Sequence, residues 1–173
     1  MTLAAGIGRF LSEGSGSGCG DAATAIGQPA KGIDQEERVS LKAIARLQLL
    51  TAAGLLVYWP LFFTVGLAPP DPPFGYFVFQ HSFAVPDMIL ALAFIRAATW
   101  LLSEDAARRS RGRALALVCS GALLFLGMLD ISFNVINDVY ALHPDALVEL
   151  AVNVWCIGFG ALSAWICARL GQA

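Results

Sequence analysis

Long apolar stretches alternate with short polar segments over most of the chain. The four apolar stretches cover residues 43–67, 84–102, 114–135 and 147–170. Each has roughly the 20 residues that an α-helix needs to cross the hydrocarbon core of a bilayer. Helices are expected because backbone groups in lipid must find hydrogen-bond partners within the protein. Since the connections are short, neighbouring helices should be antiparallel. The pattern therefore predicts an all-α, four-helix transmembrane bundle.

The composition agrees with this prediction and excludes several other classes of protein. The 173 residues are 57% hydrophobic and only 14% charged, whereas about a quarter of the residues in soluble domains are charged. The mean hydropathy is +0.67. A conventional soluble enzyme, a disordered chain and a disulfide-stapled secreted domain are therefore excluded. The net charge of −2 also argues against a nucleic-acid partner, because nucleic-acid binding needs a concentrated basic surface.

Basic residues fall on one side of the predicted spans. The loops at residues 68–83 and 136–146 contain no Lys or Arg. The other side contains Arg9, Lys31, Arg38, Lys42, Arg46, Arg108, Arg109, Arg111, Arg113 and Arg169. Because Lys and Arg accumulate in cytoplasmic loops, we expect a multi-pass protein of the cell membrane with both termini in the cytoplasm.

The first 40 residues differ from the rest of the chain. Residues 13–21 read EGSGSGCGD, which is typical of a flexible linker. We expect residues 1–40 to form a disordered cytoplasmic tail, although the mildly apolar residues 1–11 leave a short surface helix open. Residues 41–173 are expected to form the transmembrane domain.

Ionisable residues inside the predicted spans are the best candidates for function, because such residues are costly in lipid. Three of them, together with neighbouring amides and a histidine, lie in one layer near the extracytoplasmic side. The candidate ligand-binding residues are Asp130, Glu149, Asp87, Asn134 and Asn153, with His81 acting from the loop. Two or three carboxylates there could hold a cation, share a proton or bind a basic group of a ligand.

Helical spacing predicts which faces of the last two spans point into the bundle. In the third span, Asp130 and Asn134 lie on a stripe that continues through Gly127, Leu123 and Ser120. In the fourth span the stripe consists of Glu149, Asn153, Cys156, Gly160, Ser163 and Cys167. Stripes of small and polar residues are typical of helix–helix contacts in membranes. We expect Leu150, Val154, Leu162 and Trp165 to face lipid.

Structural roles remain open for several of these residues. Residues 84–87 read AVPD and resemble a helix start, where the helix dipole favours an acid such as Asp87. Glu149 also lies in a predicted first turn, and Asn153 has the character of an interhelical hydrogen-bonding residue. The aromatic loop at residues 68–83 could be an interfacial belt or a lid over the site.

No cofactor or metal is expected. His81 and His143 stand alone in different loops, whereas zinc sites use closely spaced ligands. A Ser/His/Asp site is not expected either, because no serine lies in a recognisable nucleophile elbow.

Three functions fit these observations. The first is binding or transport of a small ligand, cation or proton at the carboxylates, with transport needing a homo-oligomer. The second is a structural or assembly role beside a membrane partner subunit. The third is acid–base catalysis on a lipid-like substrate. In all three the lipid bilayer surrounds the helices.

Overall fold

Helices make up nearly all of the structure. The computed structural model describes residues 30–69, 71–142 and 146–170. Their elements are α1 (Ala30–Val65), α2 (Tyr76–Leu101), α3 (Ala106–Ile136), α4 (Val139–Leu142) and α5 (Ala146–Arg169). No strand occurs in these ranges, so the predicted all-α class is confirmed.

Four of the helices are long and apolar enough to cross a membrane. They are α1, α2, α3 and α5, and between 28% and 33% of their most apolar segments is buried within the protein. Large apolar side chains such as Val57, Leu92 and Val118 are exposed. An apolar surface of this extent is unfavourable in water, whereas lipid solvates it. The chain is therefore a multi-pass membrane protein.

Three helices begin well before the predicted spans, and one of them is α3, which begins at Ala106 instead of residue 114. α1 begins at Ala30, so residues 30–40 are helical rather than part of a tail, while residues 1–29 lie outside the described residues. α2 begins at Tyr76, and Pro86 therefore lies inside the helix. The prediction that residues 84–87 start a helix is wrong. Gly75, at φ 82°, sets the helix start, because glycine adopts this left-handed conformation without strain.

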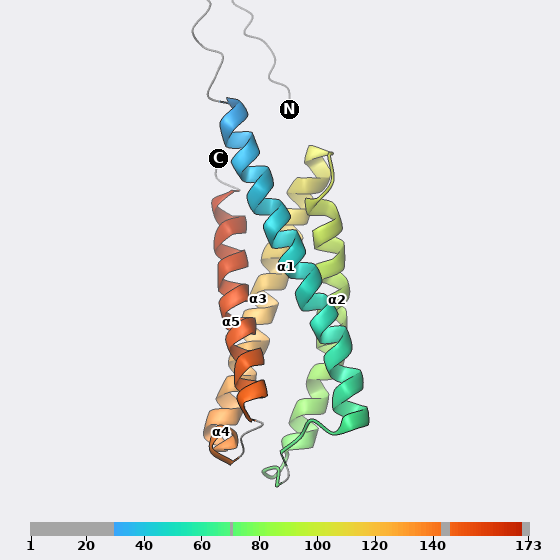
Figure 1. Cartoon of the computed structure of the whole chain (residues 1–173), viewed down its shortest axis with the longest axis vertical. Helices are drawn as coiled ribbons and strands as arrows, with labels where there is room; N and C mark the ends of the chain where they lie inside the picture. The colour runs from blue at the N-terminus through green and yellow to red at the C-terminus, as the bar shows by residue number, and fades with distance from the viewer. Residues whose placement is uncertain (1–29, 70, 143–145, 171–173) are drawn as a thin grey trace, which may run out of the picture.

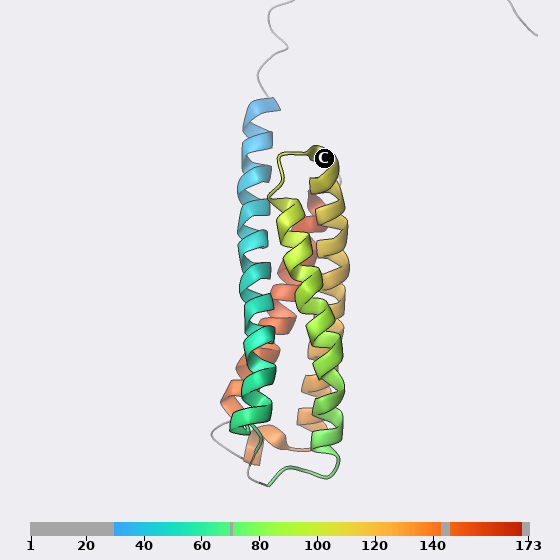
Figure 2. The same cartoon turned by 90° about the vertical axis from the view of Figure 1, so that its right-hand side faces the viewer.

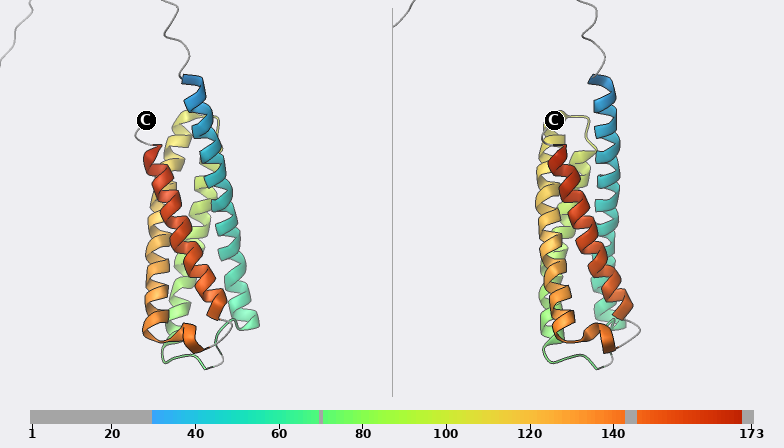
Figure 3. Two further views of the ribbon diagram at one scale, coloured as in Figure 1. Left: turned by 60° about the vertical axis from the view of Figure 1, so that its left-hand side comes forward. Right: turned by 90° about the vertical axis from the view of Figure 1, so that its left-hand side faces the viewer.

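Each long helix packs on the next long helix in the sequence, and the first and last are not in close contact within the described residues. α1 packs on α2, α2 on α3, and α3 on α5, while the short α4 packs on α5 and α3. In Figure 1, α1 and α3 run downward and α2 and α5 run upward. α1 and α5 are not closely packed within the described residues. Figure 3 shows that α5 runs obliquely across the bundle.

One end of the bundle contains the start of α1, the α2–α3 connection and the end of α5 (Figures 1 and 2). We call it the basic end, and its opposite the carboxylate end. Arg38 pairs with Glu104 at 3.0 Å, and Arg113 pairs with Glu37 at 3.1 Å. The hydrogen bond from Arg38 lowers the pKa of the Glu104 carboxyl. These pairs, the first exposed and the second half-buried, tie α1 to the α2–α3 connection and to α3.

Small residues allow α3 and α5 to approach closely. The Ser120 hydroxyl donates to the Ser163 hydroxyl at 2.8 Å. A Cβ atom at Gly160 would lie 2.8 Å from Cγ of Leu124, and one at Gly127 would lie 2.9 Å from Cβ of Cys156. The predicted stripes therefore contain residues that lie inside the bundle, where α3 and α5 face each other. The predicted lipid-facing residues Leu150, Val154, Leu162 and Trp165 are exposed.

This contact makes a matched pair of substitutions informative. Gly160→Val should destabilise the bundle by about 1–3 kcal/mol, the usual cost of overpacking. Gly158→Val is the control, because a Cβ at Gly158 meets nothing within 4 Å. Both variants carry the same β-branched residue in α5, so the helix-propensity term cancels. Unfolding in mild detergent measures the difference, and equal stabilities would contradict the close approach.

Candidate ligand-binding site

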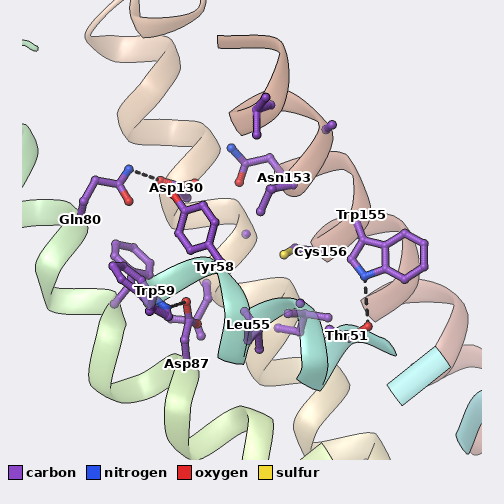
Figure 4. Close-up of a pocket in the computed structure, with 18 of the residues that line it drawn as sticks. Thr51, Leu55, Tyr58, Trp59, Gln80, Asp87, Asp130, Asn153, Trp155 and Cys156 are labelled. Atoms are coloured by element: carbon purple, nitrogen blue, oxygen red, sulfur yellow. Dashed lines mark hydrogen bonds between the residues drawn. The ribbon is translucent and has the colours of Figure 1, made fainter. Parts of the chain in front are cut away.

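A cavity of about 650 Å³ lies between α1, α2, α3 and α5, toward the carboxylate end. Its volume falls in the range of small-molecule sites, roughly 300–1,000 Å³. Most of the wall is apolar, with Leu55, Phe83 and Leu126 among its residues. Figure 4 shows the polar side chains that interrupt this wall. The cavity is therefore a pocket for a largely apolar molecule with few polar groups.

Asp87 lies in the cavity wall on α2. Its carboxylate accepts a hydrogen bond from the Trp59 indole N–H at 3.0 Å (Figure 4). Trp59 is buried on α1, so this bond ties α1 to α2. Because α2 begins at Tyr76, Asp87 lies three turns into the helix and has no role at its N-terminus.

Asp130 lies in the same cavity, on α3. It accepts a hydrogen bond from the side-chain amide of Gln80 at 2.9 Å. Tyr58 and Asn153 line the adjoining wall (Figure 4). The cavity thus brings together three of the predicted site residues, which are Asp87, Asp130 and Asn153.

Glu149 lies beside the cavity rather than in its wall, which contains its neighbours Leu147 and Val148. The Tyr76 hydroxyl donates a hydrogen bond to Oε1 of Glu149. Oε2 is buried and has no hydrogen-bond partner within the described part of the chain. Glu149 therefore joins α5 to α2 and keeps one oxygen free to accept a further hydrogen bond.

Tyr140 on α4 links the two predicted asparagines. Its hydroxyl accepts from the Asn153 amide at 2.8 Å and, more weakly, from the Asn134 amide at 3.4 Å. Burial raises the pKa of this hydroxyl, so it keeps its own proton. Asn134 is fully buried and does not line the cavity; its side-chain oxygen has no partner among the described residues. Asn134 therefore contacts the residues around the cavity through Tyr140 and not directly.

His81 lies apart from the other candidates. It is on α2 rather than in a loop, and it is exposed, with its ring against Phe62, Phe63 and Phe77. It does not line the cavity. His143 falls outside the described residues. Within those residues, no three His, Cys, Asp or Glu side chains are grouped to hold a metal.

The site contains carboxyl groups and other hydrogen-bond acceptors, and no basic side chain lines its cavity. No Lys or Arg lies between Arg46 and Arg96, between Arg113 and the end of α3, or in α5 before Arg169. Every salt bridge among the described residues is at the basic end. Asp87, Asp130 and Glu149 therefore have only neutral donors, from Trp59, Gln80 and Tyr76. Buried charges are normally paired, so this arrangement leaves a place for a cationic partner.

Sequence reasoning missed several residues of this site. The donors Trp59 and Gln80 and the linking Tyr140 are the main ones. The spacing of Thr51, Leu55, Tyr58 and Trp59 could have identified the α1 face, because these residues fall on one helical stripe. Gln48, fully buried one turn before Thr51, was also missed; neither atom of its amide has a partner in the described ranges.

Comparison with known proteins assigns the chain to no family. No protein-family model, no curated protein and no solved structure matches the chain. The functional argument therefore rests on the geometry of the cavity.

The Tyr76–Glu149 contact is testable through stability. Tyr76→Phe should lower the free energy of unfolding by about 1–3 kcal/mol, because a buried carboxylate loses its donor. Tyr58→Phe is the matched control, since the Tyr58 hydroxyl makes no protein hydrogen bond within the described residues. Unfolding in mild detergent compares the two variants. Equal effects would show that the Tyr76 hydroxyl does not support Glu149.

Proposed function

We propose that the protein binds a small molecule with an apolar body and one cationic group in the cavity between its four spanning helices. The observation that carries this proposal is the pair of carboxylates, Asp87 and Asp130, in a largely apolar cavity that no Lys or Arg side chain lines. We call Asp87 and Asp130 the cavity carboxylates. An ammonium group on the ligand supplies the positive charge that no side chain of the cavity wall supplies.

The aromatic residues of the cavity suit the same ligand. Tyr58 and Trp59 line it next to the cavity carboxylates (Figure 4). Aromatic faces attract cations, by about 2 kcal/mol or more where water is excluded. A charge-assisted hydrogen bond to a carboxylate is stronger than one between neutral groups. The apolar residues then hold the rest of the ligand through the hydrophobic effect.

The distribution of basic residues supports an orientation for this site. Cytoplasmic segments are rich in Lys and Arg, and these residues gather at the basic end, whereas the cavity lies toward the opposite end. We therefore place both termini in the cytoplasm and the cavity in the outer half of the cell membrane. Its ligand is drawn from the outer leaflet or from outside the cell.

The ligand-binding proposal has more support than an assembly role. The small-residue stripes that suggested contacts with a partner subunit are occupied within the chain itself. Ser120 and Ser163 bond to each other, and Gly127 and Gly160 lie against residues of the opposite helix. A catalytic role on a lipid-like substrate uses the same carboxylates and would be recognised by chemical conversion of a bound molecule.

Substitution of the cavity carboxylates tests the proposal. In lipid nanodiscs, Asp130→Asn and Asp87→Asn should each weaken binding of dodecylamine at least about tenfold, equivalent to about 1.4 kcal/mol. The reason is loss of the charge that pairs with the ammonium group. Dodecanol, which has the same chain without the cation, should bind more weakly and respond little to either substitution. Titration followed by tryptophan fluorescence measures all of these affinities, because Trp59 and Trp155 line the cavity.

Asp138→Asn is the matched control. Asp138 is exposed and has a positive φ of 53°, which Asn also tolerates. It makes the same change in charge outside the cavity and should leave dodecylamine binding unchanged. The proposal fails if wild-type protein does not bind the amine, or if all three substitutions have the same effect.

A further inference from the structure

The cavity is exposed on one side only. Its lining residues on α2 and α3 include Gln80, Phe83 and Leu123, which are all buried. The exposed lining residues all belong to α1 and α5, with exposed fractions of 59% for Leu50 and 57% for Val148. Thr51 and Trp59 on α1 and Asn153 on α5 are buried. The opening therefore lies between α1 and α5, the helices that are not closely packed. Both belong to the membrane-spanning set, so the opening faces the bilayer.

Side chains close the cavity toward the carboxylate end. The Gln80–Asp130 hydrogen bond joins α2 to α3 there, and the Tyr76–Glu149 hydrogen bond joins α2 to α5. Further toward this end, the rings of Phe79 and Phe133 stack with their centroids 4.0 Å apart. α4 adds the Tyr140 hydroxyl, which binds Asn153. A ligand arriving from the aqueous phase would have to break several of these contacts.

A single polar contact spans the opening. The Trp155 indole N–H on α5 donates to the Thr51 hydroxyl on α1 at 3.1 Å (Figure 4). Among the described residues it is the one side-chain hydrogen bond between α1 and α5. Trp155 is itself partly exposed. Breaking this bond costs little beside breaking the contacts at the carboxylate end, so the α1–α5 side is the easier route.

We infer that the ligand enters and leaves the cavity sideways, from the bilayer, through the opening between α1 and α5. This inference rests on the proposed function and names its ligand class: amphiphilic amines that dissolve in the membrane with their chain among the lipid tails. The hydrocarbon chain passes between the two helices, and the ammonium group reaches the cavity carboxylates. The Thr51–Trp155 hydrogen bond acts as a latch on this route.

The test measures binding kinetics of bromine-labelled dodecylamine in nanodiscs. The bromine quenches tryptophan on contact, and Trp100→Phe and Trp165→Phe remove the tryptophans that do not line the cavity. Gly54→Phe places a bulky group at the opening without adding a tryptophan, because Gly54 lines the cavity, is exposed, and meets nothing within 4 Å of an added Cβ. It should slow association by about tenfold. Gly121→Phe is the control, since Gly121 is also exposed and unobstructed but does not line the cavity.

Thr51→Val provides a second variant with the opposite expectation. It removes the acceptor of the latch and should raise both rate constants. The inference is overturned if Gly54→Phe and Gly121→Phe have the same rates as the wild type, or if Gly54→Phe speeds dissociation. In either case the proposed function stands as long as Asp130→Asn still weakens amine binding. Absence of binding to the wild type would instead overturn the proposed function and this inference with it.

Discussion

The structure depends on how three carboxylates are held in a helical bundle that lipid surrounds. An ionised group in hydrocarbon is costly, and here each carboxylate receives one hydrogen bond from a neutral donor on another helix. Trp59 binds Asp87, Gln80 binds Asp130 and Tyr76 binds Glu149. These bonds connect α2 to α1, α3 and α5. They fix the positions of the helices at the carboxylate end while leaving the three carboxyl groups without a basic partner.

The unequal packing of α5 explains why these charges border a cavity. Gly127, Gly160 and the Ser120–Ser163 hydrogen bond draw α5 against α3. α1 is held instead by α2 and by ion pairs at the basic end. At the carboxylate end, α1 and α5 stand apart in Figure 1. A small-residue contact on one side of the bundle thus leaves room on the other, where Tyr58, Trp59 and Trp155 line the space.

The class of fold could be predicted from the sequence, because the requirement for internal hydrogen bonding in lipid leaves few alternatives. The facing stripes of α3 and α5 could also be predicted, since helical periodicity places Ser120 and Ser163 on small-residue faces. The start of α2 could not. Pro86 followed by Asp87 has the local character of a helix start, but membrane helices tolerate an internal proline. That error moved Gln80 and His81 into a loop, and so hid the donor to Asp130. Partners between helices depend on rotation and tilt, which periodicity within one helix does not determine.

The central claim is that the cavity carboxylates hold a cationic ligand. Native mass spectrometry of protein gently extracted from its own membrane tests it most directly, in parallel with an Asp87→Asn/Asp130→Asn double variant. We predict that the wild type retains a small basic amphiphile and that the double variant, although folded, does not. A wild-type protein that carries no small molecule, or one that carries a second polypeptide equally well in both forms, would contradict the claim.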